Sequence, residues 1–283
     1  MAAKFGPAGT GDDFKLRGYK NSLQVPDYLV KKGLDHFEYQ CGRGVNIGLD
    51  KAALLGQEFK KCSISVSLHA PYYISMSSVD EEKRLNSVNY ILQSARAINA
   101  MGGDRIVVHT GSCGKITREQ ALSLATDTMK LAIKALKSEN LEHIHICPET
   151  MGKMNQLGTL EEVIALCKID ENLIPCIDFG HLNARTLGSV KTKSDYEKIL
   201  DCIENELGSY RLSVFHSHFS KIEYTDGGEK RHLTFEDTVY GPDYQPLMEL
   251  IYKKNLSPTF VCESAGTQSE DALKMKNYYK SLG

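Results

Sequence analysis

Eight short runs of β-branched and other apolar residues recur along this chain of 283 residues, and longer segments with helical patterning lie between them. Neighbouring parallel strands need a crossover connection, which is usually a helix, so a strand followed by a helix is the repeating unit of a parallel sheet. Eight such units in fewer than 300 residues predict an α/β fold in which the sheet closes into a (β/α)8 TIM barrel. The predicted strands are Ala3–Ala8, Phe37–Cys41, Ser63–Leu68, Arg105–Val108, His143–Cys147, Ile174–Ile177, Leu212–Phe215 and Thr259–Cys262.

The helical segments are supported by their apolar spacing and by their start signals. Thr117-x-x-Gln120 and Thr159-x-x-Glu162 match the capping box, in which the first and fourth residues satisfy each other's backbone donors. A doubly wound open sheet is the alternative architecture, but it would normally carry a Gly-x-Gly-x-x-Gly turn after a strand, and none occurs. Without a linker or a shift in composition, residues 1–283 are expected to form a single domain. The predicted helices include Glu81–Met101, Thr117–Ser138, Thr159–Lys168, Ser194–Leu207 and Tyr244–Lys254.

Composition narrows the setting of the protein without assigning its function. The formal net charge of −2 neither demands nor excludes a nucleic-acid partner. No stretch of 18 apolar residues occurs, so we expect no membrane span, and the start lacks the apolar run of a signal peptide. The eight cysteines include no Cys-x-x-Cys pair and are interpreted as small buried hydrophobes in a reducing cytoplasm. We therefore expect a cytoplasmic protein, and we expect a monomer.

An imidazole or a carboxylate follows each of six consecutive predicted strands. The carboxyl ends of barrel strands converge on one face, where the active sites of this fold lie, so these groups should meet. Without a partner, such a gathering of polar groups would cost several kcal/mol, and imidazole with carboxylate is a ligand set for zinc, iron or manganese. The candidate ligands at these ends and in one later loop are His69, His109, Glu149, Asp178, His181, His216, His232 and Glu263.

That set is too large for one ion and predicts two or three. Paired ions bridged by a carboxylate suit the hydrolysis of a phosphodiester, since one can activate water while the other steadies the leaving oxygen. Other histidines are interpreted differently. His36 precedes its run, His143 and His145 lie at the start and middle of theirs, and all three are expected to be structural or exposed. His218 stays open as a substrate contact, a group that supports a ligand, or an exposed side chain.

On these residues the chain resembles the endonuclease IV family from about Ser63 to Ser264. The matching motifs are specific in combination rather than singly. They are His-Ala-Pro-Tyr at 69–72, Val-His-Thr-Gly at 108–111, Pro-Glu at 148–149, Cys-Ile-Asp-x-x-His at 176–181, His216 followed by Lys221, Arg-His at 231–232, and Glu263.

The resemblance implies a trinuclear zinc enzyme that cleaves damaged double-stranded DNA 5′ to abasic sites in base excision repair, by attack of a metal-bound hydroxide. Mn²⁺ or Fe²⁺ could replace Zn²⁺. Glu149 would bridge two ions, and Glu263 would orient the nucleophile, which makes these two the catalytic residues. The implied ligand sets are His69, His109 and Glu149 for a first ion, Glu149, Asp178, His216 and Glu263 for a second, and His181 with His232 for a third.

Two departures from the family pattern mark a divergent branch. The family places an Asp two residues before the last histidine, where this chain has Lys230, so Glu229 is predicted to supply the missing ligand. The DNA-contacting loops also differ from those of the family. The residues predicted to bind substrate are Tyr72, Arg43, Lys153, Arg185, Lys221 and Arg231.

Two other classes of function compete with this interpretation. A sugar isomerase or epimerase of the xylose isomerase-like barrel type would need one ion, held by Glu149, Asp178, His216 and Glu263. It would not need the remaining histidines. A non-catalytic binding barrel is disfavoured, because so many ionisable strand ends require a reason.

Overall fold

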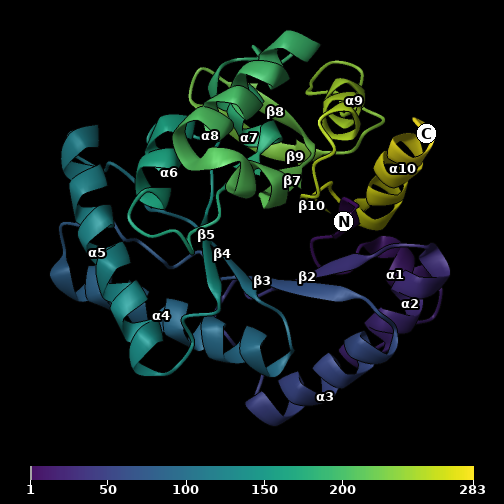
Figure 1. The fold of residues 1–283 in the computed structure, drawn as a ribbon, viewed down its shortest axis with the longest axis horizontal. Helices are drawn as coiled ribbons and strands as arrows, with labels where there is room; N and C mark the ends of the chain where they lie inside the picture. The colour runs from purple at the N-terminus through teal and green to yellow at the C-terminus, as the bar shows by residue number, and fades with distance from the viewer. Residues whose placement is uncertain (1) are drawn as a thin grey trace.

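The computed structural model describes residues 2–283, and eight parallel strands in it form a closed barrel surrounded by helices (Figure 1). The strands form two four-stranded sheets, ordered β1–β10–β7–β6 and β2–β3–β4–β5. Bridges between Ala8 and Glu38 and between Glu149 and Cys176 join the two sheets at both seams. The barrel strands are β1 (Lys4–Pro7), β2 (His36–Gln40), β3 (Ser65–His69), β4 (Arg105–Val108), β5 (His145–Pro148), β6 (Cys176–Asp178), β7 (His216–Phe219) and β10 (Thr259–Cys262).

One seam of the barrel depends on a glycine. A Cβ atom added to Gly6 in β1 would lie 1.9 Å from the carbonyl oxygen of His36 in β2. Any larger residue would therefore push these two strands apart. Because pairing of β1 with β2 closes the ring, the close approach of these two strands requires a glycine at position 6.

The helices pack outside the ring of strands (Figure 1). In α5, the buried residues Ala121, Ala125, Met129, Ala132 and Leu136 follow helical spacing, so one face of that helix covers the barrel. The helices are α1 (Asp12–Leu16), α2 (Val25–Lys32), α3 (Leu49–Lys61), α4 (Glu81–Ala100), α5 (Arg118–Ser138), α6 (Leu160–Cys167), α7 (Phe179–Arg185), α8 (Lys193–Val214), α9 (Gln245–Lys253) and α10 (Gln268–Lys280), with a short 3-10 helix at Ser22–Gln24. None of the helices in residues 2–283 combines the length and apolarity needed to cross a membrane.

Most of the predicted elements are confirmed. Two predicted strands, Arg105–Val108 and Thr259–Cys262, have the predicted bounds, and the capping boxes of Thr117 and Thr159 are formed. The seventh predicted strand is wrong. Leu212 and the residues up to Val214 end helix α8, and the strand begins at His216. A short apolar run cannot be assigned to helix or strand by periodicity, and here it packs Leu212 into the core from a helix.

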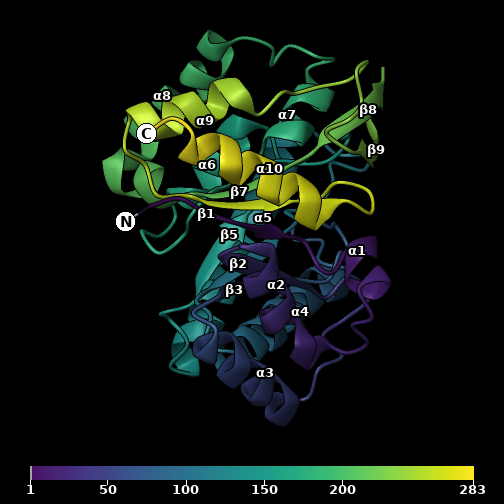
Figure 2. The same cartoon turned by 90° about the vertical axis from the view of Figure 1, so that its right-hand side faces the viewer.

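An antiparallel hairpin follows β7 and was not predicted. Its strands are β8 (Lys221–Thr225) and β9 (Gly228–Leu233), joined by a two-residue turn. In a side view, the hairpin lies at one end of the barrel and the amino terminus at the other (Figure 2). Because β1 starts at the amino terminus, the hairpin stands at the carboxyl end of the barrel strands, where the candidate ligands were expected to meet.

Candidate metal centre

A cavity of about 450 Å³ opens at the carboxyl end of the barrel. Histidine and carboxylate side chains from both halves of the barrel and from the hairpin dominate its lining. The lining residues are His69, Tyr72, His109, Glu149, Met151, Lys153, Gln156, His181, Glu229, His232 and Glu263.

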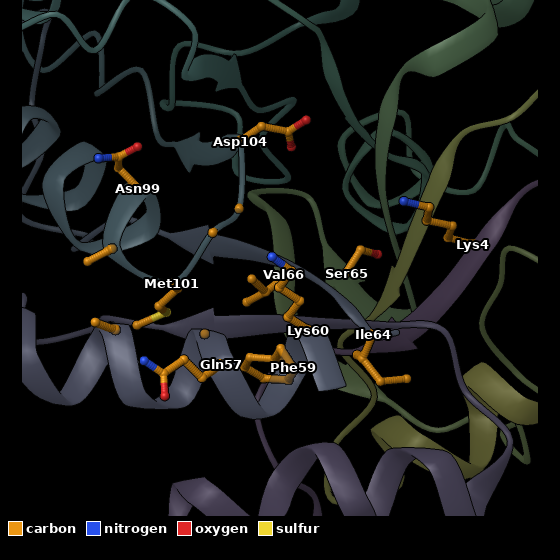
Figure 3. A pocket seen from close by; sticks show the side chains of 15 residues that line it. Lys4, Gln57, Phe59, Lys60, Ile64, Ser65, Val66, Asn99, Met101 and Asp104 are labelled. Carbon is orange, nitrogen blue, oxygen red and sulfur yellow. The ribbon is translucent and has the colours of Figure 1, made fainter. Parts of the chain in front are cut away.

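A larger hollow of about 730 Å³ lies at the opposite end of the barrel (Figure 3). Lys4, Ser65 and Asp104, which line it, stand at the amino-terminal ends of strands. Its lining contains no imidazole and one carboxylate, that of Asp104. Barrel enzymes carry their chemistry at the other face, so the smaller cavity is the candidate site.

Three ligand groups meet in or directly beneath this cavity. The first consists of His69 at the end of β3, His109 after β4 and Glu149 after β5. Oε2 of Glu149 lies 3.3 Å from Nε2 of His69 and 3.2 Å from Nε2 of His109. Ligand atoms bound about 2.0–2.1 Å from a tetrahedral zinc ion lie about 3.3 Å apart. The observed spacing therefore fits an ion held among these three side chains.

The second group combines Glu149, Asp178, His218 and Glu263, whose ligand atoms lie within 4.8 Å of one another. Oε1 of Glu149, its other carboxylate oxygen, lies 3.0 Å from Nδ1 of His218. In Asp178, Oδ1 accepts a hydrogen bond from the backbone N–H of His181, while Oδ2 is buried without a hydrogen bond, 3.2 Å from Nδ1 of His181. A buried carboxylate oxygen without a hydrogen bond is costly unless a positive charge neutralises it, so this set also fits a metal ion.

His216 does not lie in the second group, although it lies with Cys176 and His218 in another set of possible ligands. His218 takes that place, while Nε2 of His216 lies 2.8 Å from Oε2 of Glu38. The cause is the misplaced strand boundary. A strand starting at His216 points residues 216 and 218 to the same side, with His218 nearer the carboxyl end by two residues, about 6.6 Å.

The third group consists of His181, Glu229 and His232. Oε2 of Glu229 lies 3.4 Å from Nε2 of His181, and its Oε1 lies 3.9 Å from Nε2 of His232. Glu229 therefore stands where the sequence suggested it could replace the absent aspartate. Within residues 2–283, Lys230 forms an ion pair with Glu223 and none with this group.

A β-bulge explains how Glu229 and His232 face the same group. Residues three apart on a regular strand point to opposite faces. In the hairpin, Glu223 pairs with Arg231 but the next residue, Tyr224, pairs with Glu229, so Lys230 is the extra residue. One extra residue shifts the alternation by one, which brings Glu229 and His232 to the same side.

The second nitrogen of several of these imidazoles has a fixed partner. Nδ1 of His69 lies 2.8 Å from the carbonyl oxygen of Ala70, and Nδ1 of His181 lies 2.9 Å from that of Thr150. A proton on Nδ1 would be donated to these carbonyls, which leaves the Nε2 lone pair for an ion. This arrangement is common among metal-binding histidines.

The charges of the cluster shift the pKa of its members in a consistent way. Burial lowers the pKa of His69, but the hydrogen bond and charge of Glu149 outweigh it and raise the pKa to about 9. At His181, burial likewise lowers the pKa, but the negative charge of Asp178 outweighs it and the pKa rises to about 10. Burial raises the pKa of Asp178 itself. Without ions, the centre therefore holds protons where cations would otherwise neutralise the carboxylates.

Three of the six residues predicted to bind substrate lie at the mouth of the cavity. Tyr72 and Lys153 line it, and Nε of Arg43 donates a hydrogen bond of 3.3 Å to the hydroxyl of Tyr72. Tyr72 is half exposed. An exposed aromatic ring beside an arginine, in a cavity that a lysine also lines, is suited to stack on a base or sugar and to contact phosphate.

The other three residues predicted to bind substrate do not line the cavity. Arg185 is buried and donates to the carbonyl oxygens of Met151, Lys153 and Gln156, so it supports the loop at 151–156. Lys221 is also buried, and its Nζ donates to the carbonyl oxygen of Asp237 and pairs with Asp243.

Arg231 is exposed and pairs with Glu223. It follows Lys230 in β9 and precedes His232, so it points to the opposite face of the strand from His232. Arg231 is therefore next to the ligand His232 in sequence but does not face the cavity.

Sequence reasoning missed Glu38 and left His218 open. Glu38 is fully buried inside the barrel and lies against both His216 and His218. The signal was present but faint, because Glu38 is a charged residue between Phe37 and Tyr39 in the middle of a predicted strand.

A family described as the xylose isomerase-like TIM barrel matches residues 26–280. An uncharacterized protein of Methanocaldococcus jannaschii is 33% identical over 259 residues, which cover 92% of each chain. A probable endonuclease 4 of Acholeplasma laidlawii is 29% identical over 192 residues, covering 66% of this chain and 62% of that protein. The resemblance to endonuclease IV noted in the sequence is thereby confirmed.

Solved structures share the fold at lower identity. Endonuclease IV from Thermus thermophilus superimposes with a TM-score of 0.69 at 16% identity, covering 98% of this chain and 99% of that one. A D-tagatose 3-epimerase-like protein superimposes with a TM-score of 0.74 at 17% identity, covering 99% and 97%. Both likenesses support the barrel, and neither decides between nuclease and epimerase chemistry.

Proposed function

This chain belongs to the xylose isomerase-like TIM barrel family, and we propose that within it the protein is a metal-dependent phosphodiesterase that incises DNA at abasic sites. One observation carries the proposal. The two oxygens of Glu149 face separate imidazole sets, with Oε2 toward His69 and His109 and Oε1 toward His218. A carboxylate placed in this way would hold two ions together with these imidazoles, and paired ions suit phosphodiester hydrolysis.

The side chains divide the work of holding the ions. The first group and the second group share Glu149, while the hairpin supplies Glu229 and His232 to the third, with His181 from the barrel. Ions held there would activate water and neutralise charge on the phosphate and on the leaving oxygen. Zinc suits this mixture of imidazole and carboxylate, and manganese or iron would also be accepted.

The chain's own residues would bind and orient the substrate. Lys153 and Arg43 would contact backbone phosphates, and Tyr72 would pack against the nucleotide displaced from the helix. Glu263, at the edge of the second group and 3.6 Å from Nδ1 of His218, would orient the attacking water. Holding water and phosphate in line is itself a large part of the catalysis.

An epimerase is the second candidate, because solved epimerases share the barrel. Such an enzyme would use one ion at Glu149, Asp178, His218 and Glu263. A one-ion enzyme would not need His109, His181 and His232 as metal ligands. Those three side chains line the cavity together with a bridging carboxylate, which favours the phosphodiesterase.

The test is incision of an end-labelled duplex that contains one tetrahydrofuran abasic analogue. We expect a cut on the 5′ side of the lesion that chelation abolishes and added zinc restores. His109→Ala should remove this activity, because it empties the first group but leaves the four-ligand set of an epimerase complete. A zinc-loaded protein that leaves the duplex intact while interconverting ketoses would refute the nuclease and support the epimerase.

A further inference from the structure

The interior of the barrel beneath the metal centre is polar. TIM barrels usually fill this space with branched apolar side chains. Here the buried residues include His36, Glu38, Ser67 and His216, each with at most 3% of its surface exposed. Burying such groups is costly without compensation, so this layer calls for an explanation of its own.

We propose that Glu38 is a positioning residue for the metal centre, which fixes the imidazole of His218 from inside the barrel so that Nδ1 faces the ligand carboxylates. The inference rests on the proposed metal-dependent function. Oε1 of Glu38 lies 2.9 Å from Nε2 of His218. On the other edge of the same ring, Nδ1 lies 3.0 Å from Oε1 of Glu149. Nδ1 is hydrogen-bonded to Glu149, whereas Nε2 contacts Glu38 as an ion pair without a hydrogen bond.

The negative charge of Glu38 beside Nε2 favours a proton on that nitrogen when an ion occupies the second group. With the proton on Nε2, on the side of Glu38, the Nδ1 lone pair points to Glu149, Asp178 and Glu263. Nδ1 of His69 faces a neutral backbone carbonyl instead. A carboxylate behind the ring makes the imidazole a stronger ligand than a carbonyl does, so His218 should bind its ion more tightly for the presence of Glu38.

Glu38 is itself held firmly. Oε2 accepts a hydrogen bond of 2.9 Å from the hydroxyl of Ser67 and lies 2.8 Å from Nε2 of His216. Oε1 accepts a hydrogen bond of 3.1 Å from the side-chain amide of Gln40. This explains the place of His216, one layer below the ligands: it anchors the carboxylate that orients His218.

The charge of Glu38 also points to the metal centre. No lysine or arginine in residues 2–283 forms an ion pair with it, and its side chain is fully buried. A carboxylate in that position needs a nearby positive charge. If the histidines around it are neutral ligands or neutral donors, ions at the second group are the compensating charge.

The test is a zinc titration of metal-stripped protein against a chromophoric chelator, comparing wild type with Glu38→Gln. We expect one of the wild-type binding constants to weaken about 10–100-fold in Glu38→Gln while the others stay unchanged. Asp271→Asn is the matched control. Asp271 is a buried carboxylate that accepts from the Phe235 N–H, outside the barrel interior, so its loss should leave every constant unchanged.

A second variant covers the case in which Glu38→Gln does not fold. Ser67→Ala removes one hydrogen bond to Glu38 without touching His218, and it should weaken the same constant about two- to tenfold. If the variants lose the same melting temperature with and without zinc and keep the wild-type zinc affinity, the role of Glu38 is merely structural and the inference is overturned. A wild type that binds zinc in all three groups but never incises DNA would overturn the proposed function alone, since the titration still measures the role of Glu38.

Discussion

Gly152 limits the space available to the third ligand group. A Cβ atom added there would lie 2.6 Å from Cβ of Glu229 and 2.8 Å from Cδ2 of His181. An ordinary van der Waals contact is at least 3.4 Å, so Glu229 would have to retreat by about 3.4 − 2.6 = 0.8 Å. Metal sites tolerate errors of about 0.2 Å in ligand distance. We therefore expect Gly152→Ala to lose the third ion.

The backbone gives Glu229 little freedom to retreat, because its N–H donates to the carbonyl oxygen of Gly152 itself, at 3.0 Å. Metal content per folded chain, measured after dialysis against zinc, should fall by one equivalent in Gly152→Ala. Gly227→Ala is the matched control, since its added Cβ would meet only Oγ1 of Thr225, at 3.7 Å. A Gly152→Ala protein that keeps wild-type zinc content and affinity would refute the steric reasoning.

Three further predictions concern other parts of the centre. Deleting Lys230 removes the extra residue of the bulge and leaves Glu229 two residues before the histidine ligand of the hairpin, so a metal-content assay should still find the third ion. Inserting a second residue next to Lys230 should instead release that ion. His69 and His181 have pKa values of about 9 and about 10 and are protonated at pH 7 without metal, so zinc uptake at pH 7 should release protons from them. Zinc affinity should therefore rise with pH up to about 10. Calorimetry in buffers of different ionisation enthalpy measures this release, and finding none would contradict the prediction. Arg185→Met leaves three carbonyl acceptors of the 151–156 loop without their donor and should lower the free energy of unfolding by about 2–4 kcal/mol in urea titrations; a change within about 0.5 kcal/mol would mean that the loop is held by other contacts.

The predicted ligands that lie together as expected stand where strand ends are unambiguous. His69, Glu149 and Asp178 each close a strand or directly follow one, and closure of the barrel brings strand ends together whatever the loops do. Knowing the element and its end was enough to place these side chains. Their grouping followed from topology rather than from any local pattern.

The failures have local causes. His216 and His218 lie two residues apart in one strand, so choosing between them required the strand boundary to within one residue, and boundaries are the least certain part of such predictions. The apolar run at Leu212–Phe215 moved that boundary toward the amino terminus. Arg185 and Lys221 do not reach the cavity, because a cation next to a ligand can turn inward to backbone carbonyls, and sequence does not record that choice.

The three ligand groups differ in what holds them, and this bears on how such a centre can change. The first two groups stand on barrel strands, whose relative positions are fixed by closure of the ring. The third depends on the hairpin, which is positioned by local backbone contacts such as those between Glu229 and Gly152 and between Met154 and Gly227. A hairpin can absorb an added residue as a bulge, as at Lys230, whereas a barrel strand cannot without shifting its register against both neighbours. Changes in ligand spacing should therefore accumulate in the third group first, which is where this chain departs from the spacing expected of the family it resembles.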